Sequence, residues 1–352
     1  MTIRGINLIY HTLGDGGGME RYVSDIVKAI HRRNIPLRVI CRRSRWSGAP
    51  DDNLQIVALP DRTPFPRLNN ALFEARASKY CHPEWTTIGI SRVPAKVDMA
   101  IAGGNHIEYL RRKEKKPGFF HRRTIRNEAT FYERAGIVVA HSEETRREII
   151  RHYGTQAICI YPPVDTDTFS LAAREKRERV RAEIGIGNRM MLLFPSNNHS
   201  LKGADLILEA LRSFAGKIVL AVASKAPIHD PNVINLGYRT EMPALYAAAD
   251  ATILASKYET FGLVGPESVL CGTPAIFPET VGASEILSGP ACIRFERTVK
   301  GLTEALSATF AKFASGDLPL ENPGQHIKYA FSIDAHIDAL LANLPKETAG
   351  GQ

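Results

Sequence analysis

The sequence predicts an α/β protein made of two doubly wound domains, and three observations support that fold class. The chain has 352 residues, which exceeds the size at which a single hydrophobic core usually stops growing. In both halves, short β-rich runs alternate with segments of helical periodicity, as in a parallel sheet flanked by helices. Between the halves, Pro162 and Pro163 interrupt any regular element. We therefore expect domains at residues 1–165 and 166–330, then a C-terminal helix and tail at residues 331–352.

The first half contains β-rich runs at residues 5–10, 37–41, 54–59, 97–102 and 136–140. A helix is expected after the first run, because the apolar residues between positions 23 and 30 follow the i, i+3, i+4, i+7 spacing of one buried face. A second stretch with this spacing, residues 68–75, lies in a longer insertion.

The second half repeats the pattern, with strands expected at residues 190–194, 218–222, 251–254 and 275–277. Its last segment, "FSIDAHIDALLANL" at residues 331–344, carries one apolar stripe and is expected to form a helix that crosses back to the first domain. Two such domains would face each other across a cleft, and the cleft would hold the binding site.

Composition excludes several classes of protein. A hydrophobic fraction of 44% and a charged fraction of 23% are far from those of a disordered chain. No apolar run reaches the roughly 18 residues that span a bilayer, and the run at residues 6–10 is too short for a signal-peptide core, so we expect a cytoplasmic protein. Five widely spaced cysteines argue against a zinc site or a disulfide framework and favour reduced, mostly buried thiols, with a catalytic thiol as the weaker alternative.

The net charge of +8 is divided unequally. Residues 1–165 contain 27 Lys and Arg against 17 Asp and Glu, whereas residues 166–352 contain 18 against 20. The first domain is therefore expected to meet an anionic partner, and the second is not.

Glycines join the first strand to the first helix in "HTLGDGGGMERYV", residues 11–23. Glycines at such a place let backbone amides approach a phosphate, which the helix N-terminus also favours. A dinucleotide fingerprint would need a glycine where Met19 stands and a carboxylate after the second strand, where Arg42 and Arg43 follow. A nicotinamide-dependent enzyme is thus a minor alternative, and a glycine-rich turn without a ligand remains open.

Two glutamates, Glu259 and Glu267, flank a glycine-containing loop in "YETFGLVGPES", residues 258–268. The loop follows a strand and precedes a helix, so it lies at the carboxyl end of a parallel strand, where open α/β sheets bind ligands. Amides of residues 261–264 would be able to meet a diphosphate there, and both carboxylates would be able to accept hydrogen bonds from hydroxyl groups. The alternative is two solvated charges on an ordinary loop.

The segment "LYAAADATILASKYETFGLVGPESVLCGTPAI", residues 245–276, resembles the most characteristic segment of the retaining glycosyltransferases of family 4, whose signature is Glu, seven residues, Glu. The resemblance continues through "VGASEIL", "GGMERYV", "NHSLKGADLILEAL" and "YPPVDTDTF". It covers most of the chain and is weakest between residues 60 and 95. It implies a GT-B fold in which the C-terminal domain holds a nucleotide-diphosphate sugar, UDP- or GDP-linked, with no metal and no other cofactor.

The resemblance also implies roles for single residues. Glu259 would bind hydroxyls of the transferred sugar, Glu267 the ribose, and Lys202 the diphosphate. Donor amides would come from Gly17, Gly18, Phe261, Gly262, Leu263 and Val264, and the backbone near Tyr238 would border the base. Many members carry an Arg where this chain has Asn197, and Arg239 or Lys225 would then be candidates to supply the missing charge.

His106 follows the strand at residues 97–102 in "AIAGGNHIEYLRRKEKK". The family often has His or Asp at this place, near the reacting sugar, which implies a hydrogen bond to the donor sugar or the acceptor rather than a covalent role. A histidine that only caps a loop is the plainer interpretation.

Basic residues crowd the first domain and suit anionic lipid headgroups, which attract each Lys or Arg by ~1 kcal/mol. A solvated face is the plainer alternative, and nucleic acid is disfavoured because no aromatic platform is interleaved with the charges. The segment "GISRVPAKVDMAIAGGNHIEYLRRK" also looks like the corresponding part of lipopolysaccharide core glycosyltransferases. The expected acceptor or membrane patch comprises Arg42, Arg43, Arg45, Arg111, Arg112, Lys113, Lys115, Lys116, Arg122 and Arg123.

We therefore expect a cytoplasmic retaining glycosyltransferase, peripherally bound to the inner face of the membrane, that moves a hexose to a lipopolysaccharide, lipid-linked or other cell-envelope glycan. One alternative is a nucleotide-sugar epimerase or hydrolase of the same fold, and another is a non-enzymatic protein that binds anionic surfaces or nucleic acid. Asp165 and Asp167 form a D-x-D pair, but at the predicted hinge they are expected to make hinge hydrogen bonds rather than hold a metal.

Overall fold

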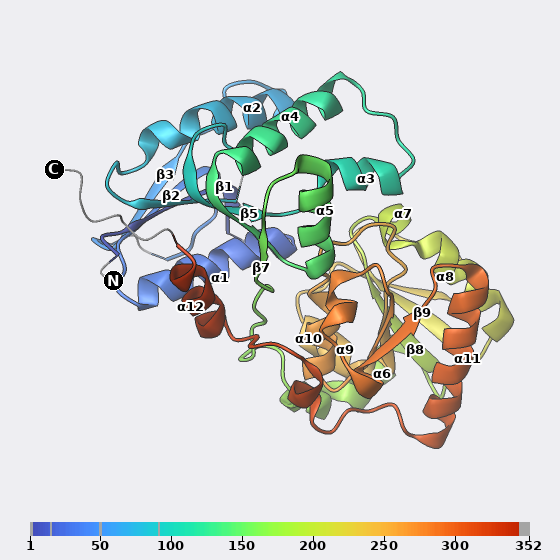
Figure 1. The fold of residues 1–352 in the computed structure, drawn as a ribbon. Coiled ribbons are helices and arrows are strands. Elements are labelled where there is room, and N and C mark those ends of the chain that lie inside the picture. Colours follow the sequence, from blue (N-terminus) through green and yellow to red (C-terminus); the bar gives the residue numbers. More distant parts are fainter. Residues whose placement is uncertain (1–2, 15, 49–50, 91, 345–352) are drawn as a thin grey trace. The chain divides into compact units, whose positions relative to one another are not determined.

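The computed structural model describes residues 3–14, 16–48, 51–90 and 92–344. The chain divides into two compact units. Unit 1 consists of two segments, the chain up to Pro163 and the chain from Ser332 on, and unit 2 is Val164–Phe331. Each unit contains one parallel sheet with helices packed on it (Figure 1). The predicted pair of doubly wound α/β domains is confirmed.

Unit 1 contains a sheet with the strand order β3-β2-β1-β4-β5-β6-β7, and its paired strands are parallel. The first strand is almost fully buried, as expected for a central strand covered on both faces. The strands are β1 Ile6–Leu13, β2 Leu37–Ser44, β3 Leu54–Ala58, β4 Thr86–Gly89, β5 Val97–Ala102, β6 Ala135–Ala140 and β7 Ile158–Cys159.

The helices of unit 1 cover the sheet through two hydrophobic clusters, one around α1 and α12 and one around Phe73, Phe131 and Tyr132. Helix α1 begins at Gly18, immediately after the glycine loop, and buries the apolar stripe predicted from its periodicity. The helices are α1 Gly18–Arg32, α2 Pro66–Arg76, α3 His106–Arg112, α4 Phe119–Glu133, α5 Glu143–Tyr153 and α12 Ile333–Ala342.

Unit 2 contains a sheet with the order β10-β9-β8-β11-β12-β13, again parallel. Its strands are β8 Met190–Pro195, β9 Ile218–Ala223, β10 Val233–Gly237, β11 Ala251–Ile253, β12 Ala275–Pro278 and β13 Cys292–Phe295. Its helices are α6 Arg177–Ile184, α7 His199–Lys202, α8 Ala204–Leu211, α9 Met242–Ala248, α10 Val264–Leu270 and α11 Val299–Ser315.

Sequence periodicity located the buried central strands but missed β4, β7, β10 and β13. Strands β4 and β7 are very short, and β10 is an exposed edge strand interrupted by Asn235, so none of them is a continuous apolar run. Helix α10 begins at Val264, between the two glutamates of the signature segment.

The last helix, α12, packs on α1 within unit 1, which confirms the predicted return of the C-terminal segment to the first domain (Figure 1). Ser332 caps the helix by accepting a hydrogen bond from the Ala335 amide. Arg33 of unit 1 donates to Asp338 at 2.6 Å and pairs with Asp334 at 3.1 Å. The tail expected at residues 345–352 lies outside the described residues.

The five cysteines form no disulfide, and Cys41, Cys271 and Cys292 are buried while Cys81 and Cys159 are half-buried, as the sequence predicted. None of the helices in the described part of the chain combines the length and hydropathy that a bilayer crossing requires.

A buried cluster of Tyr22, His141 and His336 joins α12 to the rest of unit 1. His336 lies 2.9 Å from the Tyr22 hydroxyl through Nε2 and 2.9 Å from the Tyr161 carbonyl through Nδ1. The Tyr22 ring also meets His141 edge-on at 4.7 Å between centroids. Burial lowers the pKa of His336 to about 4 and that of His141 to about 3, so the folded unit holds both imidazoles neutral.

Acid should therefore lower the stability of folded unit 1. In the unfolded chain these histidines bind protons below their ordinary pKa of 6.5, whereas in the folded unit they resist protonation. The free energy of unfolding should fall as the pH drops from 6.5 toward 4, by on the order of 1–3 kcal/mol for His336. Thermal unfolding across this pH range would measure the loss. His336→Gln, which cannot titrate, should show a shallower pH dependence, and an equal dependence in both proteins would contradict this account.

Candidate functional site

Lys202 is positioned in unit 2 by a single helical turn between β8 and α8. Asn198 starts that turn by accepting a hydrogen bond from the Leu201 amide at 3.2 Å. The turn is fastened to the segment after β11, because the Lys202 carbonyl accepts from the Ala255 amide at 3.1 Å and the Leu201 carbonyl from the Lys257 amide at 2.8 Å. The carboxyl ends of two adjacent parallel strands are thereby joined at Lys202.

Gly203 permits this close approach. Its φ of +77° lies in the left-handed region, and a Cβ there would collide with the carbonyl oxygen of Ala255. No other residue would let the backbone pass so near Ala255, so the position of Lys202 depends on this glycine.

The Lys202 ammonium forms an ion pair with the Glu259 carboxylate, 57 positions along the chain. The two side chains are 21% and 17% exposed, so the pair is partly shielded yet reachable from solvent. The Glu259 backbone forms a parallel bridge with Val281, which fixes the start of its loop beside the segment after β12. The structure therefore brings together Lys202 and Glu259, to which the resemblance assigns the diphosphate and the sugar hydroxyls.

The loop after Glu259 is folded tightly over that side chain. Gly262 has a φ of +91°, and a Cβ there would lie 3.1 Å from Cγ1 of Val281 and 3.3 Å from Cγ of Glu259. Phe261 is buried, and its carbonyl accepts from the Ala283 amide at 2.7 Å. Leu263 immediately precedes α10, and Val264 is the first residue of that helix.

Glu267 lies on α10 in a different environment from Glu259. It is buried, with 4% of its surface exposed, and accepts a hydrogen bond from the Tyr246 hydroxyl at 2.9 Å. One glutamate is thus paired with a cation and the other with a neutral phenol. The sequence did not single out Tyr246, whose position on α9 gave no signal of this contact.

The remaining donor-site predictions fall on exposed positions. Asn197 is exposed beside the capping residue of the Lys202 turn. Tyr238 is 64% exposed, and the Lys225 ammonium lies 4.9 Å from its ring centroid. Arg239 donates to Glu241 at 2.8 Å, so its charge is already balanced by that carboxylate.

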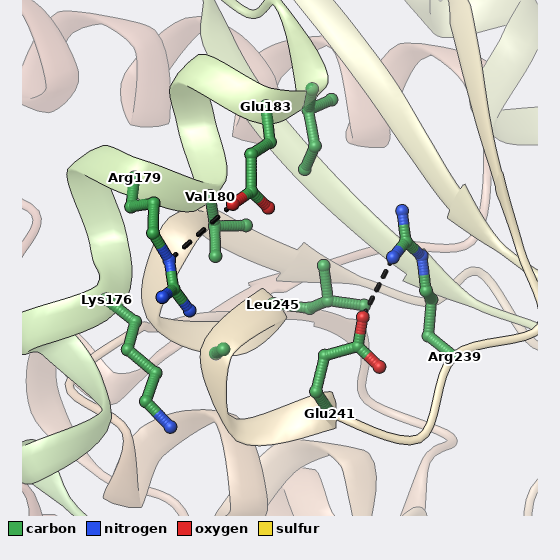
Figure 2. Close-up of a pocket in the computed structure, with 9 residues that line it drawn as sticks. Lys176, Arg179, Val180, Glu183, Arg239, Glu241 and Leu245 are labelled. Carbon is green, nitrogen blue, oxygen red and sulfur yellow. Dashed lines mark hydrogen bonds and ion pairs between the residues drawn. The ribbon is translucent and has the colours of Figure 1, made fainter.

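Arg239 and Glu241 line a surface pocket between α6 and α9 (Figure 2). Figure 2 shows a second ion pair, between Arg179 and Glu183, on the facing helix. Both arginines in the pocket thus have carboxylate partners, and Lys176 also lines it.

Ser256 was not predicted as a site residue either, although it closely follows β11. Its side chain is fully buried and its hydroxyl has no hydrogen-bond partner among the described residues. Arg297 donates to the neighbouring Ala255 carbonyl at 3.0 Å. A polar residue at the carboxyl end of a central strand was the signal that could have identified this position.

In unit 1, the glycine loop ends at the start of α1, where the Glu20 side chain caps the Gly17 amide. Gly17 precedes α1, and its amide donates to the Glu20 carboxylate at 3.0 Å, so this amide already binds an anionic group. Gly18 begins the helix, and an added Cβ there would meet nothing within 4 Å. Burial and the nearby Glu20 carboxylate together raise the pKa of Tyr10 in β1.

His106 begins α3, after Asn105 as the capping residue. Its amide donates to Glu128 at 2.7 Å, and its Nε2 lies 2.9 Å from Nδ1 of His121 on α4. Glu128 also accepts from Arg92 at 3.0 Å. Burial, the Arg92 charge and His121 lower the pKa of His106, whereas Glu128 raises it. The net effect is a lowered pKa, which favours a neutral imidazole.

Arg92 and His121 were not predicted from the sequence. Strands β1, β4 and β5 are neighbours in the sheet, so the residues that follow them converge at one edge. Arg92 stands three residues after the end of β4, and His106 four residues after the end of β5. A missed strand, β4, is the reason that Arg92 was overlooked.

Two family models match the chain: "Glycosyltransferase Family 4" over residues 16–168 and "Glycosyl transferases group 1" over residues 189–311. A "Probable transglycosylase" of Burkholderia thailandensis is 34% identical, with 96% of this chain and 95% of that protein covered. The chain belongs to the family 4 glycosyltransferases. The resemblance noted in the sequence is confirmed, and the chain is a glycosyltransferase of this family.

Solved structures share the fold of this glycosyltransferase. WaaG, a glycosyltransferase involved in lipopolysaccharide biosynthesis, superposes with a TM-score of 0.72 at 19% identity, covering 94% of this chain and 98% of WaaG. Anabaena Alr3699/HepE in complex with UDP and glucose superposes with a TM-score of 0.71 at 17% identity, covering 97% and 100%.

Four of the ten basic residues in the predicted acceptor or membrane patch are neutralised by carboxylates. Arg42 and Arg43 both pair with Asp61, at 3.2 and 2.5 Å. Arg111 and Arg112 both pair with the buried Glu108. These arginines lower the pKa of Glu108 to about 2 against the effect of its burial.

The other predicted patch residues differ in their surroundings. Lys113 lies over the Tyr109 ring at 5.2 Å, and Arg45 is exposed beside the glycine loop. Exposed positions without an ion pair among the described residues are Lys115, Lys116, Arg122 and Arg123.

The D-x-D pair makes hydrogen bonds within its own segment. The Asp165 carboxylate accepts from the amides of Asp167 and Thr168, each at 3.1 Å. Over the described ranges, no group of three or more His, Cys, Asp or Glu side chains is placed to hold a metal ion.

Gly203→Ala should displace Lys202 and lower the stability of unit 2. The left-handed backbone alone costs about 1–2 kcal/mol in a non-glycine residue, and the collision with Ala255 should add ~1–3 kcal/mol. Gly216 is the matched control, since its φ is +74° and an added Cβ meets nothing within 4 Å. Thermal unfolding should show a larger loss for Gly203→Ala than for Gly216→Ala, and equal losses would contradict the role assigned to Gly203.

Proposed function

We propose that this protein is a retaining glycosyltransferase that moves a hexose from a UDP- or GDP-linked sugar to a lipopolysaccharide, lipid-linked or other cell-envelope glycan. The Lys202–Glu259 ion pair is the observation that carries the proposal. It places a partly shielded cation beside a carboxylate that can accept hydrogen bonds from hydroxyl groups. Both lie at the carboxyl ends of adjacent strands, where nucleotide ligands bind in open α/β sheets.

The pair suggests an exchange of partners when a donor binds. Lys202 would turn from Glu259 to the diphosphate, which carries more negative charge than one carboxylate. Glu259 would then accept hydrogen bonds from hydroxyls of the sugar. In this exchange Lys202 keeps an anionic partner both without and with the donor, and hydrogen bonds from the sugar hydroxyls would replace the ammonium at Glu259.

The proposed chemistry is cleavage of the bond between the anomeric carbon and the diphosphate oxygen. Negative charge grows on the departing diphosphate, and Lys202 with the amides of the Phe261–Val264 loop would stabilise it without a metal ion. The acceptor hydroxyl would attack the same face of the sugar and pass its proton to the departing diphosphate. Configuration at the anomeric carbon would thus be retained.

Other residues would hold the rest of the donor. Glu267, fixed by Tyr246, would accept from the ribose hydroxyls, and the backbone near the exposed Tyr238 would border the base. Asn197 and Arg239 stay within the proposed donor site, although Arg239 would first have to leave Glu241. HepE, which shares the fold, is solved in complex with UDP-glucose, and this supports a UDP-linked donor.

Unit 1 would contribute the amides of Gly17 and Gly18 and the side chain of His106. Because Glu20 occupies the Gly17 amide, a donor phosphate there would have to replace that carboxylate. Neutral His106, held by its contact with His121, would form a hydrogen bond to the donor sugar or the acceptor.

Two observations support an acceptor at the cell envelope. WaaG, which shares the fold, is involved in lipopolysaccharide biosynthesis. The first half of the chain also carries the excess of basic residues, which suits an anionic glycan or lipid and a peripheral association with the cytoplasmic face of the membrane. No nucleic-acid partner is proposed.

A panel of nucleotide sugars tests the proposal through thermal stabilisation. A donor at 100 times its dissociation constant should add ~2.7 kcal/mol to the free energy of unfolding. Lys202→Met should reduce turnover on the order of 100- to 1,000-fold, because a preorganised charge near the leaving group is lost. If no nucleotide or nucleotide sugar raises the melting temperature of the wild-type protein, the proposed function is wrong. Release of nucleotide without an acceptor would instead favour a hydrolase or epimerase.

A further inference from the structure

Four large apolar side chains of unit 1 project into solvent at the start of two helices. Phe65 and Leu68 at the start of α2 are 65% and 43% exposed. Phe119 and Phe120 at the start of α4 are 77% and 53% exposed. We call these four residues the aromatic edge. Leaving this apolar surface in water is unfavourable relative to burying it.

The aromatic edge is continuous across the two helices. The Arg67 guanidinium lies 5.2 Å from the Phe120 ring centroid, and the Asn127 amide donates to Glu74 at 3.3 Å. Both contacts join positions 53 residues apart, so α2 and α4 run parallel with their N-terminal ends together. Figure 1 shows α2 and α4 side by side on unit 1.

Basic residues surround the aromatic edge and are not neutralised by carboxylates. None of them forms an ion pair among the described residues, in contrast to Arg42, Arg43, Arg111 and Arg112. Glu114 is the acidic residue that accompanies them on the segment between α3 and α4. The exposed basic residues are Arg62, Arg67, Lys115, Lys116, Arg122, Arg123 and Arg126.

We propose that the aromatic edge docks on an anionic lipid bilayer, with the phenyl rings at the boundary between headgroups and acyl chains and the arginines and lysines at the lipid phosphates. The proposal rests on the proposed function, in which the acceptor lies at the membrane, and it assigns the docking to α2 and α4 rather than to the paired arginines. Apolar area and basic charge add in such interfacial binding.

The geometry disfavours single-stranded nucleic acid as the occupant. Base stacking needs open ring faces, but the Arg67 guanidinium already covers one face of Phe120. Phe119 and Phe120 meet edge to face, with an interplanar angle of 81°, so they do not form a flat platform. Rings of different orientation are no obstacle to burial in lipid, where contact is not directional.

Vesicle cosedimentation with the full chain tests the proposal. The wild-type protein should bind vesicles of phosphatidylcholine with phosphatidylglycerol and bind phosphatidylcholine alone much more weakly. Phe119→Ser with Phe120→Ser should reduce the partition coefficient on the order of 10- to 100-fold. Both side chains are exposed, so the melting temperature should be unchanged. Val299→Ser, at a residue 41% exposed in unit 2, is the matched apolar control and should bind as the wild type does.

A second double variant, which removes two basic side chains, measures the electrostatic contribution to vesicle binding. Arg123→Gln with Arg126→Gln should weaken binding to anionic vesicles roughly 10- to 30-fold, because each basic residue contributes about fivefold. Lys217→Gln with Lys312→Gln removes the same charge from exposed positions in unit 2 and should leave vesicle binding unchanged.

Four outcomes would overturn the docking proposal. Two concern vesicles: the wild type binds none, or the double phenylalanine variant binds anionic vesicles as tightly as the wild type does. The third is self-association through the edge, seen as an oligomer in sedimentation that the same variant dissolves. The fourth is binding of an oligonucleotide in preference to vesicles. Thermal stabilisation by a nucleotide sugar tests the proposed function separately, since none of these double variants changes Lys202 or Glu259.

Discussion

The Lys202–Glu259 ion pair depends on a backbone approach that glycine permits, and the proposed donor site depends on that pair. Gly203 brings the Lys202 turn against Ala255, and Gly262 folds the next loop over Glu259. Both glycines have positive φ, so the site rests on backbone geometry that other residues adopt at a cost. The result is a cation that already has an anionic partner, which the proposed donor diphosphate would replace.

The two units use the same topological rule for different chemistry. In each, adjacent parallel strands end at one edge of the sheet, and the side chains that follow them meet there. Unit 2 gathers Lys202 and Glu259 at this edge, whereas unit 1 gathers Arg92, Glu128 and His106. Glu128 accepts hydrogen bonds from Arg92 and from the His106 amide, which positions His106. Burial and the basic surroundings favour the neutral form of the His106 imidazole.

The sequence predicted the fold and the signature loop well because both depend on local patterns. Buried parallel strands are continuous apolar runs, and Glu259 and Glu267 stand at a recognisable spacing. It did not identify which arginines are neutralised: Asp61 pairs with arginines on β2, and Glu108 pairs with arginines three and four residues along its own helix. It also missed the aromatic edge, since Phe65 and Phe119 resemble core residues until the packing of α2 and α4 leaves them exposed.

Binding of a nucleoside diphosphate and of its nucleotide sugar to Glu259→Gln, measured by titration calorimetry beside transfer to an acceptor, tests the central claim most directly. Removing the carboxylate frees Lys202 from its partner. The account predicts that the nucleoside diphosphate binds as tightly as to the wild type or more tightly, while sugar transfer falls on the order of 100-fold or more. Undiminished transfer, or loss of nucleoside diphosphate binding, would contradict the exchange of partners at Lys202.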